Sequence, residues 1–388
     1  MRRIGRYIHD RPDWPKLYWN RDLLAERLAS VRHRQGRLLG RLEGLGFKLR
    51  QEAVLQTLTE DVLKTSEIEG EYLDEEQVRS SIARRLGIDF GGLKPVDRDI
   101  EGIVEMMLDA TRNYDDPLTG ERLFAWHASL FPSGRSGMRR IGVGSWRDDS
   151  GGPMQVVSGP IGRQRVHFEA MGAERIGREM QSFLNWFNGD AEADWVAKAA
   201  LAHLWFVTIH PFGDGNGRIA RAIADLALAR SEQSSQRFYS MSAQIRNERA
   251  AYYEVLEQTQ QGTIDITLWM DWFLGCLGRA IEGAQITLGS VLAKARFWES
   301  IADFPLNQRQ RLVLNRLLDN FEGKLTTSKW AKLAKCSQDT ALRDIVPLIE
   351  RGVLIRNPAG GRSASYALAK IAVHSDNRES WTGTRREV

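Results

Sequence analysis

The chain has 388 residues, of which 42% are hydrophobic and 27% are charged, close to the globular average. This composition excludes a wholly disordered chain, a collagen and a coiled-coil rod, and the length favours two or three domains. No run reaches the roughly 20 apolar residues that span a bilayer, and the basic start lacks the apolar stretch of a signal peptide. Two cysteines are too few for a disulfide framework or a zinc cluster. We therefore expect a soluble, cytoplasmic protein without membrane contact.

The net charge of +4 is unevenly distributed along the chain. Residues 307–388 contain 15 Lys and Arg against 8 Asp and Glu, an excess of +7. The rest of the chain contains 39 basic and 42 acidic side chains, a net of −3. A basic end on a nearly neutral body indicates an accessory module that binds nucleic acid or a partner.

The first 95 residues are expected to form an N-terminal arm and a helical region. Residues 1–20 are rich in aromatic residues and proline, which is typical of an extended arm that packs on the body. From residue 20 to about residue 81, apolar residues recur at helical spacing. The Gly-Gly-Leu-Lys-Pro stretch at residues 91–95 then breaks the pattern.

Residues 96–290 are expected to form a mainly α-helical core. Helices are predicted at residues 99–114, 122–130, 174–187, 194–208, 217–230, 247–260 and 267–288. The glycine-rich residues 132–173 interrupt these helices, and short extended stretches flank residues 158–162. This pattern predicts one β-hairpin with a long loop, inserted among the helices.

Residues 305–370 are predicted to form a separate winged-helix module. Their pattern predicts a helix around residues 312–317, helices at 328–334 and 338–351, and strands at 354–356 and 363–368. A Pro-Ala-Gly-Gly turn at residues 358–361 would join the two strands. Residues 371–388 are polar and are expected to form a flexible tail.

The third helix of this module is the candidate DNA-recognition helix. Arg343 is its one outward cation, whereas Asp339, Asp344 and Glu350 are acidic. A helix with so few cations favours contacts with protein over contacts with DNA.

One loop, from His210 to Arg221, combines several features of a phosphate-transfer site. It reads His-Pro-Phe-Gly-Asp-Gly-Asn-Gly-Arg-Ile-Ala-Arg, follows an apolar helix and ends at the start of an alanine-rich helix. Gly215, Asn216 and Gly217 permit tight turns that point backbone N–H groups at an anion. Arg218 and Arg221 project from one face of the helix, so they complete a cradle for a polyphosphate.

Two other side chains of this loop carry chemistry. His210 can act as a general base near neutral pH. Asp214 offers carboxylate oxygens of the kind that Mg²⁺ uses when it bridges phosphates. His203, seven residues before His210, is expected to pack in the core rather than to act as a second ligand.

The loop resembles the signature of the Fic family of protein nucleotidyltransferases, His-x-Phe-x-Asp/Glu-Gly-Asn-Gly-Arg-x-x-Arg, and matches it at every fixed position. The resemblance extends from about Tyr7 to Leu277. It implies a Fic helical core, ATP as the substrate, and a protein hydroxyl as the acceptor. Arg218 and Arg221 would then hold the β- and γ-phosphates. Relatives with this domain arrangement suggest a homodimer.

The resemblance also identifies the predicted hairpin as the family's flap, which holds the target segment beside the site. The flap residues would be Met154, Val156, Val157, Val166 and Phe168. Similar family members have a proline pair after the flap, whereas this chain has Ala170-Met171-Gly172-Ala173.

A second family element is the autoinhibitory motif Ser/Thr-x-x-x-Glu-Gly/Asn, which Thr65-Ser-Glu-Ile-Glu69-Gly70 resembles. Periodicity supports an inward role for Glu69 independently, because it continues a helical stripe. The earlier members of that stripe are Leu55, Leu58, Val62 and Ser66. A carboxylate on a buried stripe needs a cationic partner, and the resemblance names Arg221. The alternative is an exposed glutamate without this role.

The adenosine pocket is predicted on weaker grounds. Tyr252, Tyr253 and Gln260 resemble residues that line this pocket in relatives. Tyrosines at helical spacing also suit a protein core, so both interpretations stay open.

Together these features predict a protein adenylyltransferase. With Mg²⁺, it would transfer AMP from ATP to Tyr, Ser or Thr hydroxyls of target proteins and of itself, and Glu69 would inhibit it. Three alternatives stay open. The same cradle could transfer another nucleotide or group, because nothing in the loop reads the base. Glu69 could position a water, so that the enzyme chiefly removes AMP from proteins. The chain could also be a DNA-binding regulator whose Fic core senses nucleotide.

Overall fold

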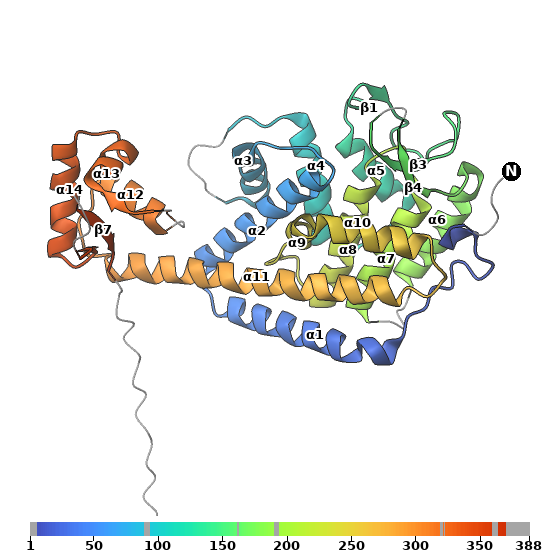
Figure 1. The fold of residues 1–388 in the computed structure, drawn as a ribbon, viewed down its shortest axis with the longest axis horizontal. Coiled ribbons are helices and arrows are strands. Elements are labelled where there is room, and N and C mark those ends of the chain that lie inside the picture. Colours follow the sequence, from blue (N-terminus) through green and yellow to red (C-terminus); the bar gives the residue numbers. More distant parts are fainter. Residues whose placement is uncertain are drawn as a thin grey trace, which may run out of the picture. The chain divides into compact units, whose positions relative to one another are not determined.

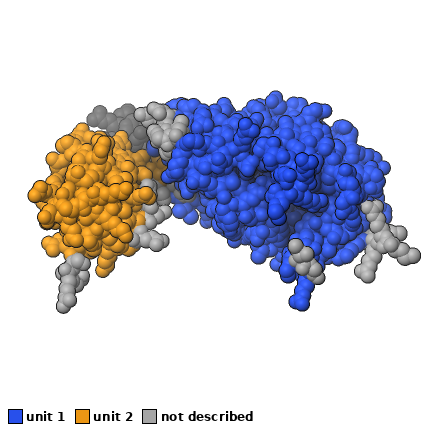
Figure 2. All heavy atoms as spheres, turned by 90° about the horizontal axis from the view of Figure 1, so that it is seen from above, with its two compact units in different colours: residues 1–288 blue, residues 289–388 orange. Residues whose placement is uncertain are grey.

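The computed structural model describes residues 6–88, 94–160, 163–189, 194–318, 321, 323–358 and 364–369. The chain divides into two compact units, residues 1–288 and 289–388 (Figure 2). The described part is mainly helical with small antiparallel sheets, as predicted (Figure 1). None of the described helices is long and apolar enough to cross a bilayer. Residues 91–93 of the predicted break lie outside the described residues.

The first unit begins with the arm, which packs on the body through aromatic and polar contacts. A short 3-10 helix, η1 (Ile8–Asp10), contains the fully buried Ile8. The indole N–H of Trp14 donates to Glu179 at 2.9 Å. Three helices follow: α1 (Arg21–Glu43), α2 (Phe47–Ile68) and α3 (Glu75–Leu86). Asn20 caps α1 and Asp74 caps α3 with side-chain oxygens.

The rest of this unit consists of helices and two small hairpins, where one hairpin was predicted. Its helices are α4 (Arg98–Arg112), α5 (Gly120–Leu130), α6 (Ala173–Asn188), α7 (Trp195–Ile209), α8 (Asn216–Glu232), α9 (Met241–Asn247), α10 (Arg249–Gln260) and the part of α11 (Thr267–Ser300) up to Leu288. The hairpins are β1 (Arg135–Ser136) with β2 (Arg139–Arg140), and β3 (Gln155–Ser158) with β4 (Arg165–Glu169). The first hairpin escaped prediction because strands of two residues leave no alternating pattern.

Helices α7 and α8 form the centre of the first unit, and the loop between them carries the signature residues. Every residue from Val196 to Ile209 is buried, because α7 is apolar on all sides and is enclosed by other elements. Gly215, with φ +77°, ends the loop just before α8. A Cβ atom here would lie 2.9 Å from the ring of Phe131, so both backbone conformation and space require glycine.

The second unit has the three helices and two strands in the predicted order, with one added strand. Its elements are α12 (Gln308–Leu318), β5 (Leu325–Thr326), α13 (Thr327–Leu333), α14 (Gln338–Glu350), β6 (Leu354–Arg356) and β7 (Ser365–Leu368). The strands pair antiparallel in the order β5-β7-β6. Trp330, Leu314 and Ile345 are fully buried in its core. Residues 359–361 of the predicted turn and the predicted tail at 371–388 lie outside the described residues.

Candidate active site

The signature loop is held in one conformation by its own side chains. His210 ends α7 in the left-handed region, with φ 53° and ψ 59°, which is uncommon for a residue other than glycine. The side-chain amide of Asn216 bonds the backbone of Phe212 twice: Oδ1 accepts from the N–H at 3.0 Å, and Nδ2 donates to the carbonyl at 2.8 Å. Phe212 is fully buried. The Asn216 side chain therefore closes the loop, and only its backbone is left to face an anion.

His210 is set up as a neutral base. Its Nδ1 lies 3.3 Å from the carbonyl oxygen of Val207. Since a carbonyl can only accept, Nδ1 carries the proton and Nε2 is left with a free lone pair. The pKa of His210 is lowered to about 4, chiefly by burial and also by the nearby charge of Arg147, while the bond to Val207 and the charges of Asp214 and Glu69 act in the opposite direction. The imidazole is thus uncharged at neutral pH, with its single proton on Nδ1 and Nε2 free to accept a second one.

This lowered pKa predicts the acid limb of the pH–rate profile. A protonated imidazole cannot accept a proton, so activity is lost only as the pH falls through the pKa of His210. We expect the rate to stay level well below pH 6.5, the ordinary histidine value, and to fall as the pH approaches about 4. Single-turnover rates across this range, with circular dichroism as the control for folding, test it. A midpoint at the ordinary value would contradict the burial of this base.

Arg147 is a site residue that sequence analysis missed. Its side chain is 4% exposed and its guanidinium bonds three segments of the chain. Nε donates to the carbonyl of His210 at 2.8 Å, Nη2 to the carbonyl of Met171 at 2.6 Å, and Nη1 to Asp149 at 2.6 Å. It thereby holds the left-handed backbone of His210. The one signal in the sequence is an Asp two residues later, which does not indicate where Arg147 points.

Substitutions of Arg147 distinguish a role in positioning His210 from a role in the stability of the fold alone. Because a misplaced catalytic group costs up to about a hundredfold in rate, we expect Arg147→Gln to lower turnover by about that factor, with little change in the KM for ATP. The loss of its charge should also move the acid limb to higher pH, since that charge lowers the pKa of His210. Arg147→Lys keeps the charge but not the planar fork, so its rate should fall while its acid limb stays in place. A fall in melting temperature with an unmoved acid limb in Arg147→Gln would indicate a structural role alone.

Asp214 offers a carboxylate at the edge of the loop. Its Oδ1 accepts the N–H of Gly215 at 2.6 Å, and its Oδ2 accepts the hydroxyl of Ser136 on β1. Each oxygen keeps a lone pair for a metal ion. The described residues contain no group of three or more His, Cys, Asp or Glu that could hold a metal by themselves. A single carboxylate fits Mg²⁺, which takes its other ligands from water and substrate phosphates.

Both arginines of the signature lie buried, and each is bonded to a glutamate that follows α2. Arg221 Nη2 donates to Glu69 at 2.6 Å, and Arg218 Nη1 donates to Glu71 at 2.7 Å. The two guanidinium side chains are 2% and 3% exposed, respectively. Among the described residues, Arg218 Nε and Arg221 Nη1 have no hydrogen-bond partner. Buried donors without a partner fit an anionic ligand such as a polyphosphate.

Glu69 meets Arg221 as predicted, but it is not on a buried stripe. Helix α2 ends at Ile68, so Glu69 occupies the C-cap position and its side chain is 30% exposed. Gly70 follows with φ 87° and turns the chain away. The expectation of a buried carboxylate is therefore wrong, because it extrapolated the helix by one residue. The carboxylate instead lies at the entrance of the site.

The Glu69 carboxylate also covers the first turn of α8. Its Oε1 lies 2.3 Å from the position that a Cβ atom on Gly217 would occupy. Thr65, fully buried one turn earlier, accepts from Arg221 Nε at 2.7 Å and from Nη2 at 2.9 Å through its hydroxyl and carbonyl oxygens. Although burial by itself lowers the pKa of Arg221, Glu69 raises it, so the guanidinium stays charged. A carboxylate thus occupies the place where a helix N-terminus attracts an anion.

The predicted adenosine residues differ in their exposure. Tyr252 is 2% exposed and its hydroxyl lies 3.0 Å from Nε2 of the fully buried His203. Gln260 is also buried and bonds Thr208 at 3.3 Å. These residues belong to the core in this structure, and burial lowers the pKa of His203 to about 3. Tyr253 is partly exposed, and its ring lies under the guanidinium of Arg249.

The predicted flap residues do not share one face. Phe168 is 2% exposed and packs edge-on against Tyr7 of the arm, which fastens the hairpin to the body. The expectation that Phe168 contacts a target is therefore wrong, because the arm covers this face of the strand. Val157 is exposed. Met154, Val156 and Val166 are partly buried. The exit of the flap is held by Arg147 at Met171 and by Asp149, which accepts the N–H of Ala173 at 2.7 Å.

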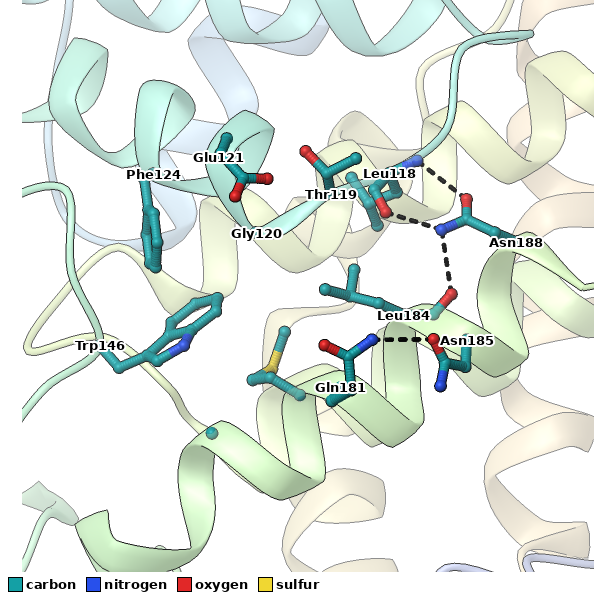
Figure 3. Close-up of a pocket in the computed structure, with 12 residues that line it drawn as sticks. Leu118, Thr119, Gly120, Glu121, Phe124, Trp146, Gln181, Leu184, Asn185 and Asn188 are labelled. Carbon is teal, nitrogen blue, oxygen red and sulfur yellow. Dashed lines mark hydrogen bonds between the residues drawn. The ribbon is translucent and has the colours of Figure 1, made fainter.

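A solvent-open hollow lies beside the loop, between the start of α5 and helix α6 (Figure 3). Its volume is about 370 Å³. Phe124 and Trp146 form one wall, with ring centroids 4.4 Å apart, and Trp146 also packs on Phe212. On the opposite wall Gln181 donates to Asn185 at 2.9 Å. None of the predicted site residues lines this hollow.

Comparison with known proteins decides the family. The model of the Fic/DOC family matches residues 117–228, which include the whole loop described above. This chain contains a Fic domain. Residues 7–88 of the Fic chain, which include Thr65 and Glu69, match a domain of unknown function (DUF4172).

Curated relatives of this Fic protein match it over a short part of their length. Protein adenylyltransferase fic-1 of Caenorhabditis elegans is 33% identical over 81 residues, which are 20% of this chain and 16% of the relative. Protein adenylyltransferase Fic of Drosophila mojavensis is 31% identical over 101 residues, 23% of this chain and 20% of the relative. A probable protein adenylyltransferase of Aquifex aeolicus is 29% identical over 108 residues, 28% of this chain and 30% of that protein.

Solved structures confirm the Fic fold. A Fic family protein from Desulfovibrio desulfuricans G20 matches with a TM-score of 0.53 at 20% identity, over 92% of this chain and 99% of that one. A Fic domain containing signaling protein from Bacteroides thetaiotaomicron matches with a TM-score of 0.50 at 21% identity, over 66% of this chain and 95% of that one.

Proposed function

We propose that this Fic protein is a protein adenylyltransferase, which transfers AMP from ATP to Tyr, Ser or Thr hydroxyls of target proteins and of itself. One observation carries the proposal. The loop between α7 and α8, together with the start of α8, carries a neutral histidine base and two buried arginines with unpartnered donors. The names of the curated relatives support the same activity.

In this mechanism the residues of the loop bind, orient and deprotonate. Arg218 and Arg221 hold the β- and γ-phosphates, and the N–H groups at the start of α8 face the phosphate oxygens. Nε2 of His210 takes the proton of the target hydroxyl as its oxygen bonds to the α-phosphorus. The bond between the α-phosphorus and the bridging oxygen breaks, and pyrophosphate leaves. Asp214 would hold Mg²⁺, which supplies charge neutralisation at the phosphates when bound.

We further infer that the segment after α2 inhibits the enzyme at both arginines. Glu69 occupies Arg221 and the first turn of α8, so it competes with the γ-phosphate. Glu71 occupies Arg218 in the same way and was not predicted from the sequence, although it stands two residues after Glu69. With both contacts in place, ATP is held in a blocked pose and the resting enzyme is slow. Displacement of one short segment would free both arginines together.

Transfer of label from ATP tests the proposed activity. The Glu69→Gly protein is incubated with a lysate and ATP labelled at the α-phosphate, and in parallel with ATP labelled at the γ-phosphate. We expect label on protein from the first only, because AMP transfer retains the α-phosphate and releases the other two. Label from the γ-phosphate would indicate phosphorylation. Absence of protein label in both, with ATP bound, would favour a nucleotide sensor. Loss of label from modified protein on adding the wild type would favour removal of AMP.

The second unit supports a partner-binding role rather than DNA binding. The exposed positions of α14 include Leu342 and Val346, at 46% and 41%, beside its one cation Arg343. Asp344 is buried and accepts two hydrogen bonds from Arg309 of α12, so it fastens these helices together. DNA-reading helices instead present several cations and polar groups to the groove. We propose that this unit contacts protein.

A further inference from the structure

The first hairpin, β1 with β2, stands directly against the catalytic loop. We call residues Arg135 to Arg140 the arginine hairpin. The hydroxyl of Ser136 bonds Asp214, and Ile141, just after the hairpin, lies 3.7 Å from where a Cβ atom on Gly213 would be. Figure 1 shows β1 on the same side of the first unit as β3 and β4. Whatever contacts this hairpin is therefore near the proposed metal ligand.

The arginines of this hairpin form no ion pair within the described part of the protein. Arg135, Arg139 and Arg140 are exposed, and no ion pair joins any of them to a carboxylate within the described ranges. Arg135 also stands directly across from Arg140 in the strand register. Like charges opposite each other destabilise a strand pair. The arrangement therefore weakens the strand pair, and Arg135 keeps its charge unpaired while its Nη1 donates to the carbonyl of Met138 at 3.2 Å.

The excess of positive charge continues toward the flap. Residues 135–168 contain six arginines and two aspartates. Asp149 is used by Arg147, and Asp148 accepts from Ser150. Arg139 lies beside the loop that leads to β3, because its Nη2 is 3.7 Å from the position that a Cβ atom on Gly151 would occupy. Arg165 of β4 pairs with Glu257 of α10 at 2.8 Å. Within the described ranges, the arginines of this region that form no ion pair are therefore Arg135, Arg139, Arg140 and Arg163.

We infer that the arginine hairpin binds an acidic segment of the target protein, next to the hydroxyl that is modified. This inference rests on the proposed function and names its substrate class. Charge complementarity favours an acidic segment, and the bound nucleotide would otherwise repel it. Met138 at the tip of the hairpin is 95% exposed, an adaptable apolar contact suited to a peptide. The hairpin carries no aromatic ring on which a base could stack.

A binding measurement tests this inference separately from transfer. The probes are short fluorescein-labelled peptides with one central tyrosine, flanked either by glutamates or by serines, and the readout is fluorescence anisotropy with the full wild-type chain. We expect the acidic peptide to bind about tenfold more tightly than the serine peptide, and the difference to shrink with added salt. Equal affinity for the two peptides would overturn the inference.

The matched variants locate the binding site. Arg139→Glu/Arg140→Glu should abolish the preference for the acidic peptide, and it should not weaken the hairpin, because a glutamate at 140 then faces Arg135. Arg37→Glu/Arg41→Glu, an identical change of charge at exposed positions of α1, should leave the preference unchanged. Equal loss in both variants would overturn the inference by indicating a general charge effect.

Three further outcomes distinguish the alternatives. A single-stranded oligonucleotide of equal charge that binds more tightly than the acidic peptide, and loses this binding in Arg139→Glu/Arg140→Glu, would overturn the inference in favour of nucleic acid. If acidic peptides bind through the hairpin but no label moves from ATP to protein, the surface stands and the proposed transfer fails. If label moves but the peptides bind equally, the proposed function stands and this inference fails.

Discussion

Replacing His210 with alanine is expected to lower AMP transfer by about 10²–10⁴-fold, while ATP binds almost as tightly as before. The reason is the position of the imidazole. Nδ1 is engaged with Val207, so Nε2 is the atom that takes the proton of the incoming hydroxyl. The triphosphate is held elsewhere, by Arg218, Arg221 and the start of α8. Loss of the base therefore affects the chemical step and not the nucleotide contacts.

The measurement compares label transfer from α-labelled ATP with ATP affinity by calorimetry on one preparation. Since His210 has φ 53°, alanine adds backbone strain that could mimic a catalytic defect. His210→Asn controls for this, because asparagine tolerates the left-handed region without being a base. His33→Ala, at an exposed position of α1, serves as the unrelated control. Turnover at the wild-type rate in both His210 variants would remove His210 from the mechanism.

Replacing Glu69 with glycine is expected to raise transfer by on the order of a hundredfold. A difference of about 2.7 kcal/mol between blocked and competent nucleotide poses corresponds to this factor. The rise follows because Arg221 is freed for the γ-phosphate and the first turn of α8 is uncovered. Arg221 still keeps its bonds to the hydroxyl and carbonyl of Thr65, so the fold should lose little stability.

The double variant Glu69→Gly/Glu71→Gln is expected to be more active than Glu69→Gly alone, since Glu71 otherwise stays on Arg218. Glu75→Gln, an exposed glutamate in the first turn of α3, is the matched control and should leave activity unchanged. Labelling and melting temperature are measured together. Lower activity with a large fall in melting temperature in Glu69→Gly would mean that the ion pair is structural and that the inhibitory assignment is wrong. Equal activity of the single and double variants would remove Glu71 from the inhibition.

The predictable parts of this protein are those that depend on residues close together in the sequence. Helical periodicity placed α4, α6, α7, α8, α10 and the helices of the second unit, because buried faces recur every three to four residues. The loop from His210 to Arg221 was also predictable, since its glycines, its aspartate and its arginines lie in one short segment of the sequence. The first hairpin and β5, with strands of two residues, were not predicted. Strands that short carry no periodicity.

The contacts that complete the site depend on segments far apart in the chain. Arg147 reaches the carbonyl of His210 across 63 positions, and Glu71 reaches Arg218 across 147. No local pattern encodes such pairs, because they arise only when separate segments of the chain pack together. The end of α2 at Ile68 likewise brought Glu69 to an exposed capping position rather than a buried one. By itself, the sequence determined which groups could do phosphate chemistry. Tertiary packing decided which of them are held, covered or already occupied.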